Sequence, residues 1–122
     1  MGEPQPPVRS PSEASSKTPV RMTPAFFFLM LALTEGPRHG HAMARDVEER
    51  SGGSVKLGPG SLYWSLGRLA DVGLIAEVES PADETDGRRR YYGLTPSGRE
   101  VLARETAMLE RIVDYARLRR IV

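Results

Sequence analysis

The sequence predicts a mainly α-helical fold with one small β-hairpin. Two Thr-Pro pairs, at 23–24 and 95–96, mark helix starts, because the hydroxyl caps the first turn and proline fits its first position. The run 60–72 carries leucines at helical spacing. Two short strand-like runs, 74–79 and 90–95, flank a polar segment with an Asp-Gly turn signal.

The first helix is expected from Pro24 to about Glu35, where Gly36-Pro37 ends it. Its sequence is almost entirely apolar, from Phe26 to Leu33, so no polar face is left. A helix of this kind is buried on more than one side. We therefore expect one side to face its own domain and the other to need a further partner.

Two more helices follow before the hairpin. The first, from about His41 to Arg50, is short and amphipathic. The second begins at Pro59-Gly60-Ser61, ends near Val72 before Gly73, and carries a core-facing stripe of three leucines, Leu62, Leu66 and Leu69. Trp64 falls on the opposite, outward side of this helix, which is unusual for tryptophan.

The last helix is expected from Ser97 to Val122, and it spans roughly 35 to 40 Å at about 1.5 Å per residue. The rest of the domain is too small to cover that length. Apolar residues recur along it at heptad spacing, which predicts a helix-packing stripe: Val101, Leu102, Met108, Leu109, Ile112, Tyr115 and Ala116.

Three helices followed by a hairpin form a winged helix-turn-helix, a DNA-binding arrangement in which one helix enters the major groove. The sequence thus divides into three parts. Residues 1–22 are expected to be a disordered Pro/Ser-rich tail, since they hold five of the ten prolines and almost nothing apolar. Residues 23–96 form the winged domain, and 97–122 the C-terminal dimerisation helix.

Several sequence blocks, in the right order over residues 25 to about 110, resemble the PadR family of transcriptional regulators. The blocks are the Glu-Gly-Pro-Arg-His-Gly run at 35–40, the Leu-Gly-Pro-Gly-Ser-Leu-Tyr run at 57–63, Arg68-Leu69, Gly73-Leu74-Ile75 and the segment 87–99. The resemblance, to the short form with one C-terminal helix, implies a homodimeric repressor that binds a double-stranded DNA operator. It also implies that the last helix packs against the partner's first helix, which adds Phe27 and Leu31 to the dimerisation set, and that a small-molecule inducer acts at this interface.

Seven residues of the third helix and the hairpin are the expected DNA contacts: Ser61, Tyr63, Trp64, Arg68, Arg88, Arg89 and Arg90. Arginine can bind guanine through O6 and N7, whereas a basic wing would contact phosphates without reading sequence. Two positions stay open for Trp64: contact with thymine methyls or sugars, and packing against the wing. Two interpretations are equally open for Tyr63: core packing with its hydroxyl on a phosphate, and core packing alone.

Other function classes find little support. The chain has no cysteine, and no arrangement of Ser, His and acid residues suggests catalysis, so we expect no enzyme, metal site or cofactor. His39 and His41 are expected to be structural, with His39 capping or bonding a turn. Without an export signal or a 20-residue apolar run, the protein is expected to be soluble and cytoplasmic, without membrane contact.

Net charge opposes the DNA-binding interpretation. From residue 23 onward the chain has 14 Lys+Arg and 14 Asp+Glu, whereas DNA-binding domains usually have an excess of base. A winged-helix protein-interaction module that never touches DNA is therefore the alternative. Only the positions of the charges can distinguish the two functions.

Overall fold

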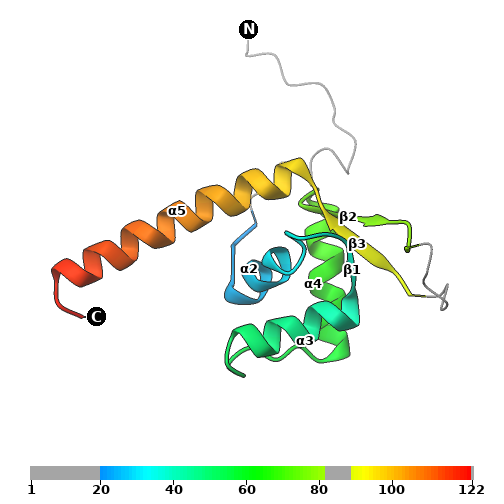
Figure 1. Ribbon diagram of the computed structural model, residues 1–122, viewed down its shortest axis with the longest axis horizontal. Helices are drawn as coiled ribbons and strands as arrows, with labels where there is room; N and C mark the ends of the chain where they lie inside the picture. The colour runs from blue at the N-terminus through cyan, green and yellow to red at the C-terminus, as the bar shows by residue number, and fades with distance from the viewer. Residues whose placement is uncertain (1–19, 82–88, 122) are drawn as a thin grey trace, which may run out of the picture.

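The structure, a computed structural model, describes residues 20–81 and 89–121. Helices α2 (Pro24–Leu31), α3 (Gly40–Arg50) and α4 (Pro59–Asp71) pack together beside a small sheet, and α5 (Pro96–Leu118) projects away from them (Figure 1). The predicted mainly helical winged helix-turn-helix fold is confirmed.

Helix starts follow the capping signals in the sequence. The Thr23 hydroxyl accepts a hydrogen bond from the Phe26 amide at 3.2 Å, and Thr95 does the same for the Gly98 amide at 2.9 Å. The side chain of His39 caps α3 by accepting from the Ala42 amide at 3.1 Å, which confirms the expected structural role of this histidine.

Two predicted helix ends are wrong. The first helix stops at Leu31 instead of about Glu35, because the following turns form i to i+3 bonds and the Thr34 hydroxyl donates to the Leu31 carbonyl at 2.8 Å. The last helix stops at Leu118 instead of Val122. Arg120 adopts a left-handed φ of 63°, and the amide of Ile121 then bonds back to the Ala116 carbonyl at 2.9 Å.

The sheet has three strands, one more than the predicted hairpin. Strand β2 (Ile75–Val78) pairs antiparallel with β3 (Tyr91–Leu94), and β1 (Arg38–His39) pairs antiparallel with the other edge of β3. Only Ile75 is buried in β2. The two-residue β1 ties the turn before α3 to the wing.

The core lies between α2, α3, α4 and the base of the sheet. The predicted stripe of α4 is confirmed, since Leu62, Leu66 and Leu69 are all buried. Val20 and Met22, within the predicted tail 1–22, pack against the core, while residues 1–19 lie outside the described part of the chain. Within the described residues, no helix is both long and apolar enough to cross a membrane.

One glycine fixes where α5 begins. A methyl group on Gly98 would overlap the carbonyl oxygen of Leu74 and press on the side chain of Leu94. The first turn of α5 therefore lies directly on the chain that enters β2, and no larger residue can replace this glycine without a shift of backbone.

We predict that Gly98→Ala lowers the free energy of unfolding by about 1–3 kcal/mol, because the added methyl meets a backbone carbonyl that cannot rotate away. Chemical denaturation followed by circular dichroism measures this. Gly67→Ala is the matched control, since nothing lies near its added methyl. It should gain about 0.5–1 kcal/mol from helix propensity. Equal stability of the two variants would contradict the close approach.

Candidate nucleic-acid interface

The outward face of α4 is exposed over most of its length. Tyr63 and Trp64 are 59% and 66% exposed, Ser61 is exposed and the side chain of Arg68 is partly so. The opposite side of the helix forms the core. Tyrosine and tryptophan are enriched at binding interfaces, because each combines a large apolar ring with a polar group.

Of the two positions expected for Trp64, packing against the wing is not found. Its ring lies 6.1 Å from the ring of Phe26, with the planes 14° apart, so the two are stacked. The prediction that Trp64 packs against the wing is therefore wrong, because its ring stacks on that of Phe26 in the first turn of α2. Since Phe26 is buried and Trp64 is mostly exposed, the stack fixes one ring face and leaves the other side open.

One flank of α4 forms a hollow with the segment that leads into α2. Ser61, Trp64 and Arg68 line it from α4, and Arg21 lines it from the other side. The Arg68 guanidinium lies 3.8 Å from the carboxylate of Asp71, with both side chains accessible to solvent. Such a surface pair is weak and leaves the guanidinium able to bind another anion.

The other flank of α4 faces the wing. Tyr63 of α4 lines a second hollow together with Arg89 and Arg90, which precede β3, and with His39 and His41 at the start of α3. Six of the seven predicted DNA contacts thus line one or other of the two hollows beside α4. The seventh, Arg88, lies outside the described residues.

Arg21 and His39 are among the residues of these hollows that were not predicted as contacts. Arg21 was assigned to the tail, although Val20 and Met22 on either side are the apolar signal that this stretch packs on the domain. His39 was assigned only a structural role. Its pairing with Tyr91 across β1 and β3, which brings it to the wing, has no local signal in the sequence.

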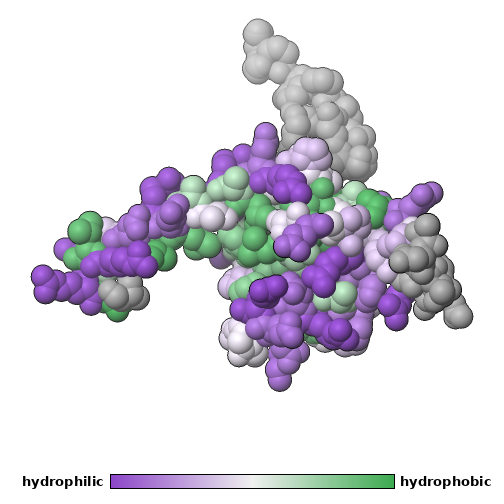
Figure 2. All heavy atoms as spheres, in the orientation of Figure 1, coloured by the Kyte–Doolittle hydropathy of each residue, from purple (hydrophilic) through white to green (hydrophobic). Residues whose placement is uncertain are grey.

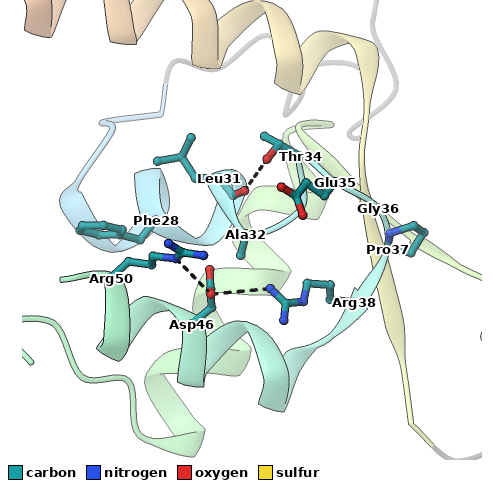
Figure 3. Close-up of a pocket in the computed structure, with 10 residues that line it drawn as sticks. All are labelled: Phe28, Leu31, Ala32, Thr34, Glu35, Gly36, Pro37, Arg38, Asp46 and Arg50. Atoms are coloured by element: carbon teal, nitrogen blue, oxygen red, sulfur yellow. Dashed lines mark hydrogen bonds and ion pairs between the residues drawn. The ribbon is translucent and has the colours of Figure 1, made fainter. Parts of the chain in front are cut away.

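A third hollow lies on another side, between the end of α2 and α3 (Figure 3). Asp46 of α3 lies between two arginines there, 3.7 Å from Arg38 and 3.4 Å from Arg50. Phe28 and Leu31 form its apolar part. The two arginines on this side already face a carboxylate. The described part of the chain has no group of three or more His, Cys, Asp or Glu side chains placed to hold a metal ion.

The predicted dimerisation stripe divides where α5 leaves the domain. Leu102 is 6% exposed and belongs to the core of its own domain, so it is not available to a partner, and Phe27 and Val101 are half-buried beside it. Beyond Glu105, Ala116 is partly covered, whereas the other stripe residues are exposed: Met108, Leu109, Ile112 and Tyr115. Figure 2 shows hydrophobic side chains between charged ones along this projecting helix. Leu31 of α2 is exposed as well.

Residues 29–104 match the family of PadR-like transcriptional regulators, which is more than half of the chain. The chain belongs to the PadR-like family. Members of this family are transcription regulators, not enzymes.

Several solved structures share the fold. A PadR family transcription regulator from hypervirulent Clostridium difficile is 26% identical, with a TM-score of 0.68 over 79% of this chain and 97% of that one. RosR of H. salinarum is 28% identical, with a TM-score of 0.58 over 71% of this chain and 73% of that one. Bacillus subtilis PadR in complex with operator DNA is 22% identical, with a TM-score of 0.59 over 70% of this chain and 48% of that one.

A curated relative is an uncharacterized 37.1 kDa protein in transposon TN4556 of Streptomyces fradiae. It is 40% identical over 93 residues, which are 76% of this chain and 25% of that protein. The chain thus spans about a quarter of the length of this relative.

We predict that Trp64 and Phe26 are energetically coupled. In a double-mutant cycle of Trp64→Ala and Phe26→Leu, the coupling should be about 0.5–1.5 kcal/mol, as for other stacked aromatic pairs. Denaturant unfolding of the four proteins by circular dichroism measures it. Additive losses of stability would show that the two rings do not support each other.

Proposed function

We propose that this PadR-like protein is a sequence-specific DNA-binding repressor that acts as a homodimer in the cytoplasm. The observation that carries the proposal is the exposed face of α4, with arginines in the hollows on both of its flanks. A neutral domain can bind DNA when its basic side chains gather on one face, since phosphates respond to local charge. The operator complex of Bacillus subtilis PadR, which has the same fold, supports the proposal.

In this proposal α4 enters the major groove and reads base edges. Ser61 and Arg68 are the donors on its outward face, and the arginine can bind guanine in bidentate fashion. Tyr63 and Trp64 supply apolar contact with thymine methyls or sugars. Arg89 and Arg90, with Arg88 next to them in the sequence, contact the backbone and provide affinity without sequence information.

The homodimer in this proposal covers the apolar stripe of α5. Leu109, Ile112 and Tyr115 are exposed where α5 leaves its domain, and apolar surface in contact with water is unfavourable. A second copy supplies the complementary surface, with Leu31 of α2 among its exposed apolar residues. Two copies of α4 would then read a roughly palindromic operator, with half-sites about one helical turn apart.

Release from DNA is proposed to follow the binding of a small-molecule inducer at this interface. Leu31 belongs both to the proposed interface and to the hollow between α2 and α3. A ligand seated there would touch the partner's helix and alter the distance between the two α4 helices. It would favour one dimer geometry only through contacts that differ between the two geometries.

The DNA face is tested with Arg68→Ala and Arg90→Ala. We expect each change to weaken binding of a mixed-sequence duplex and to reduce the slope of log affinity against log salt by about 1, because each removes one phosphate or base contact. Fluorescence anisotropy over a salt series measures both quantities. Arg68→Ala should also relax base preference in a selection from genomic fragments.

Arg117→Ala is the matched control, since it removes the same charge from the far end of α5. It should leave affinity and slope as in the wild type. If all three variants bind as the wild type does, α4 and the wing are not the DNA face. If the wild type binds no duplex at low salt, the chain is instead a winged-helix interaction module.

The dimer is tested with Leu109→Asp combined with Ile112→Asp. We expect this protein to be a monomer, or insoluble, because two carboxylates would have to be buried without partners. Light scattering after size exclusion measures the mass. Ala103→Asp with Ala107→Asp adds the same charge on the opposite side of α5 and should stay dimeric. A folded, dimeric Leu109→Asp/Ile112→Asp protein would refute the stripe as an interface.

A further inference from the structure

The hollow between α4 and the segment that leads into α2 contains an arginine to which the proposed function gives no role. Trp64 and Arg68 line this hollow from α4, and Arg21 lines it from the other side. Arg21 is exposed to solvent. Among the described residues, no carboxylate lines the hollow. A positive charge therefore lies directly beside the helix that is proposed to bind DNA.

The backbone on both sides of Arg21 is attached to the domain. The side chains of Val20 and Met22 pack against the core. The next residue, Thr23, caps α2, since its hydroxyl accepts from the Phe26 amide at 3.2 Å. Arg21 is therefore not part of a free arm. Because its backbone is already held beside α4, less conformational entropy is lost when the guanidinium binds a partner.

The dimensions of B-DNA place the two flanks of α4 against different strands. An α-helix with its side chains is about 10–12 Å across, and the major groove is about 12 Å wide. A helix in this groove thus has one row of phosphates on each side. Arg90 of the wing lines the hollow on one flank of α4, and Arg21 lines the hollow on the other. In the proposed complex each guanidinium faces a different strand.

A guanidinium beside the helix suits a phosphate. It can donate two parallel N–H···O bonds to phosphate oxygens, and these bonds are charge-assisted. Base edges are read instead by side chains on the outward face of α4, where Ser61 and Arg68 lie.

We propose that Arg21 binds a backbone phosphate on the strand opposite the one that Arg90 contacts, so that phosphates hold α4 in the groove from both sides. The proposal rests on the proposed function and adds a positioning residue to it. Contacts with phosphates set the orientation of a protein on the duplex without reading sequence. A contact on each flank would fix the angle at which α4 lies in the groove.

Two substitutions of Arg21 test the contact. We expect Arg21→Ala to bind a mixed-sequence duplex about tenfold more weakly, and to reduce the slope of log affinity against log salt by about 1 for each bound copy. Arg21→Lys keeps the charge and should keep the slope, with affinity within about threefold of the wild type because an ammonium group lacks the planar fork. Fluorescence anisotropy over a salt series measures both quantities.

Thermal unfolding separates DNA contact from a structural role. Both variants should melt at the wild-type temperature, since Arg21 is exposed. Arg117→Ala again removes the same charge from the far end of α5 and should leave affinity and slope unchanged. Wild-type affinity of Arg21→Ala would overturn the proposal. A loss of affinity that comes with a lower melting temperature would overturn it as well.

Neutral phosphates locate the two contacts on the duplex. In a fragment obtained by the genomic selection, single methylphosphonates replace the phosphates of one half-site in turn. We expect Arg21→Ala to lose sensitivity to a replacement on one strand, and Arg90→Ala to lose sensitivity to a replacement on the other. If both variants lose sensitivity on the same strand, or if Arg21→Ala keeps the full wild-type pattern, the proposal is overturned.

These outcomes are distinct from those of the proposed function. Binding by the wild type, with losses in Arg68→Ala and Arg90→Ala, tests the DNA face as a whole. If those losses are found while Arg21→Ala binds as the wild type does, the Arg21 contact alone is overturned. If the wild type binds no duplex, both proposals are overturned.

Discussion

The structure depends most on one hydroxyl group, that of Thr95. It donates to the carbonyl of Gly73 at 2.6 Å and accepts from the amide of Gly98 at 2.9 Å, and its backbone amide bonds to the Leu74 carbonyl at 3.2 Å. The end of α4, the entry to β2, the exit of β3 and the first turn of α5 thus meet at a single residue. Because Gly98 admits no larger side chain there, the direction of α5 relative to α4 is set by this joint.

The direction of α5 relative to α4 connects the proposed dimer interface with the proposed DNA-binding face. Since this joint fixes the direction in which α5 leaves the domain, the geometry of the proposed dimer would also determine how far apart two α4 helices lie. Arg99 adds a second bond, from its guanidinium to the Thr34 carbonyl at 3.1 Å, which ties α5 to the turn after α2. The turn after α2 and the first turns of α5 are thus joined by a side-chain contact as well as by the core.

Much of this fold was predictable because its signals are local. The Thr-Pro pairs place the starts of α2 and α5, and Leu62, Leu66 and Leu69 place the buried side of α4. What the sequence could not predict depends on contacts between distant segments. Strand β1 exists only because Arg38 and His39 meet β3, and Trp64 stacks on a residue 38 positions earlier.

The candidate site shows the same division. Six predicted contacts gather beside α4, since helical periodicity and the position of the wing determine their side. Arg21 and His39 were not predicted as site residues, because one lay in a segment of tail-like composition and the other was assigned only to a turn. The neutral net charge also finds a physical account. Arg38 and Arg50 face Asp46 on another side of the domain, whereas Arg21, Arg68, Arg89 and Arg90 gather in the two hollows beside α4.

The bare outer part of α5 has a consequence for regulation. A helix of this length is only marginally stable without a packing surface. In the proposed dimer, the order of this segment and the pairing of subunits would therefore be one equilibrium, and mass action would govern it. The concentration of the protein in a cell would then itself regulate DNA binding. At low concentration the chains would separate and lose the paired spacing of their α4 helices. They would then dissociate from the operator even when no small-molecule ligand is present.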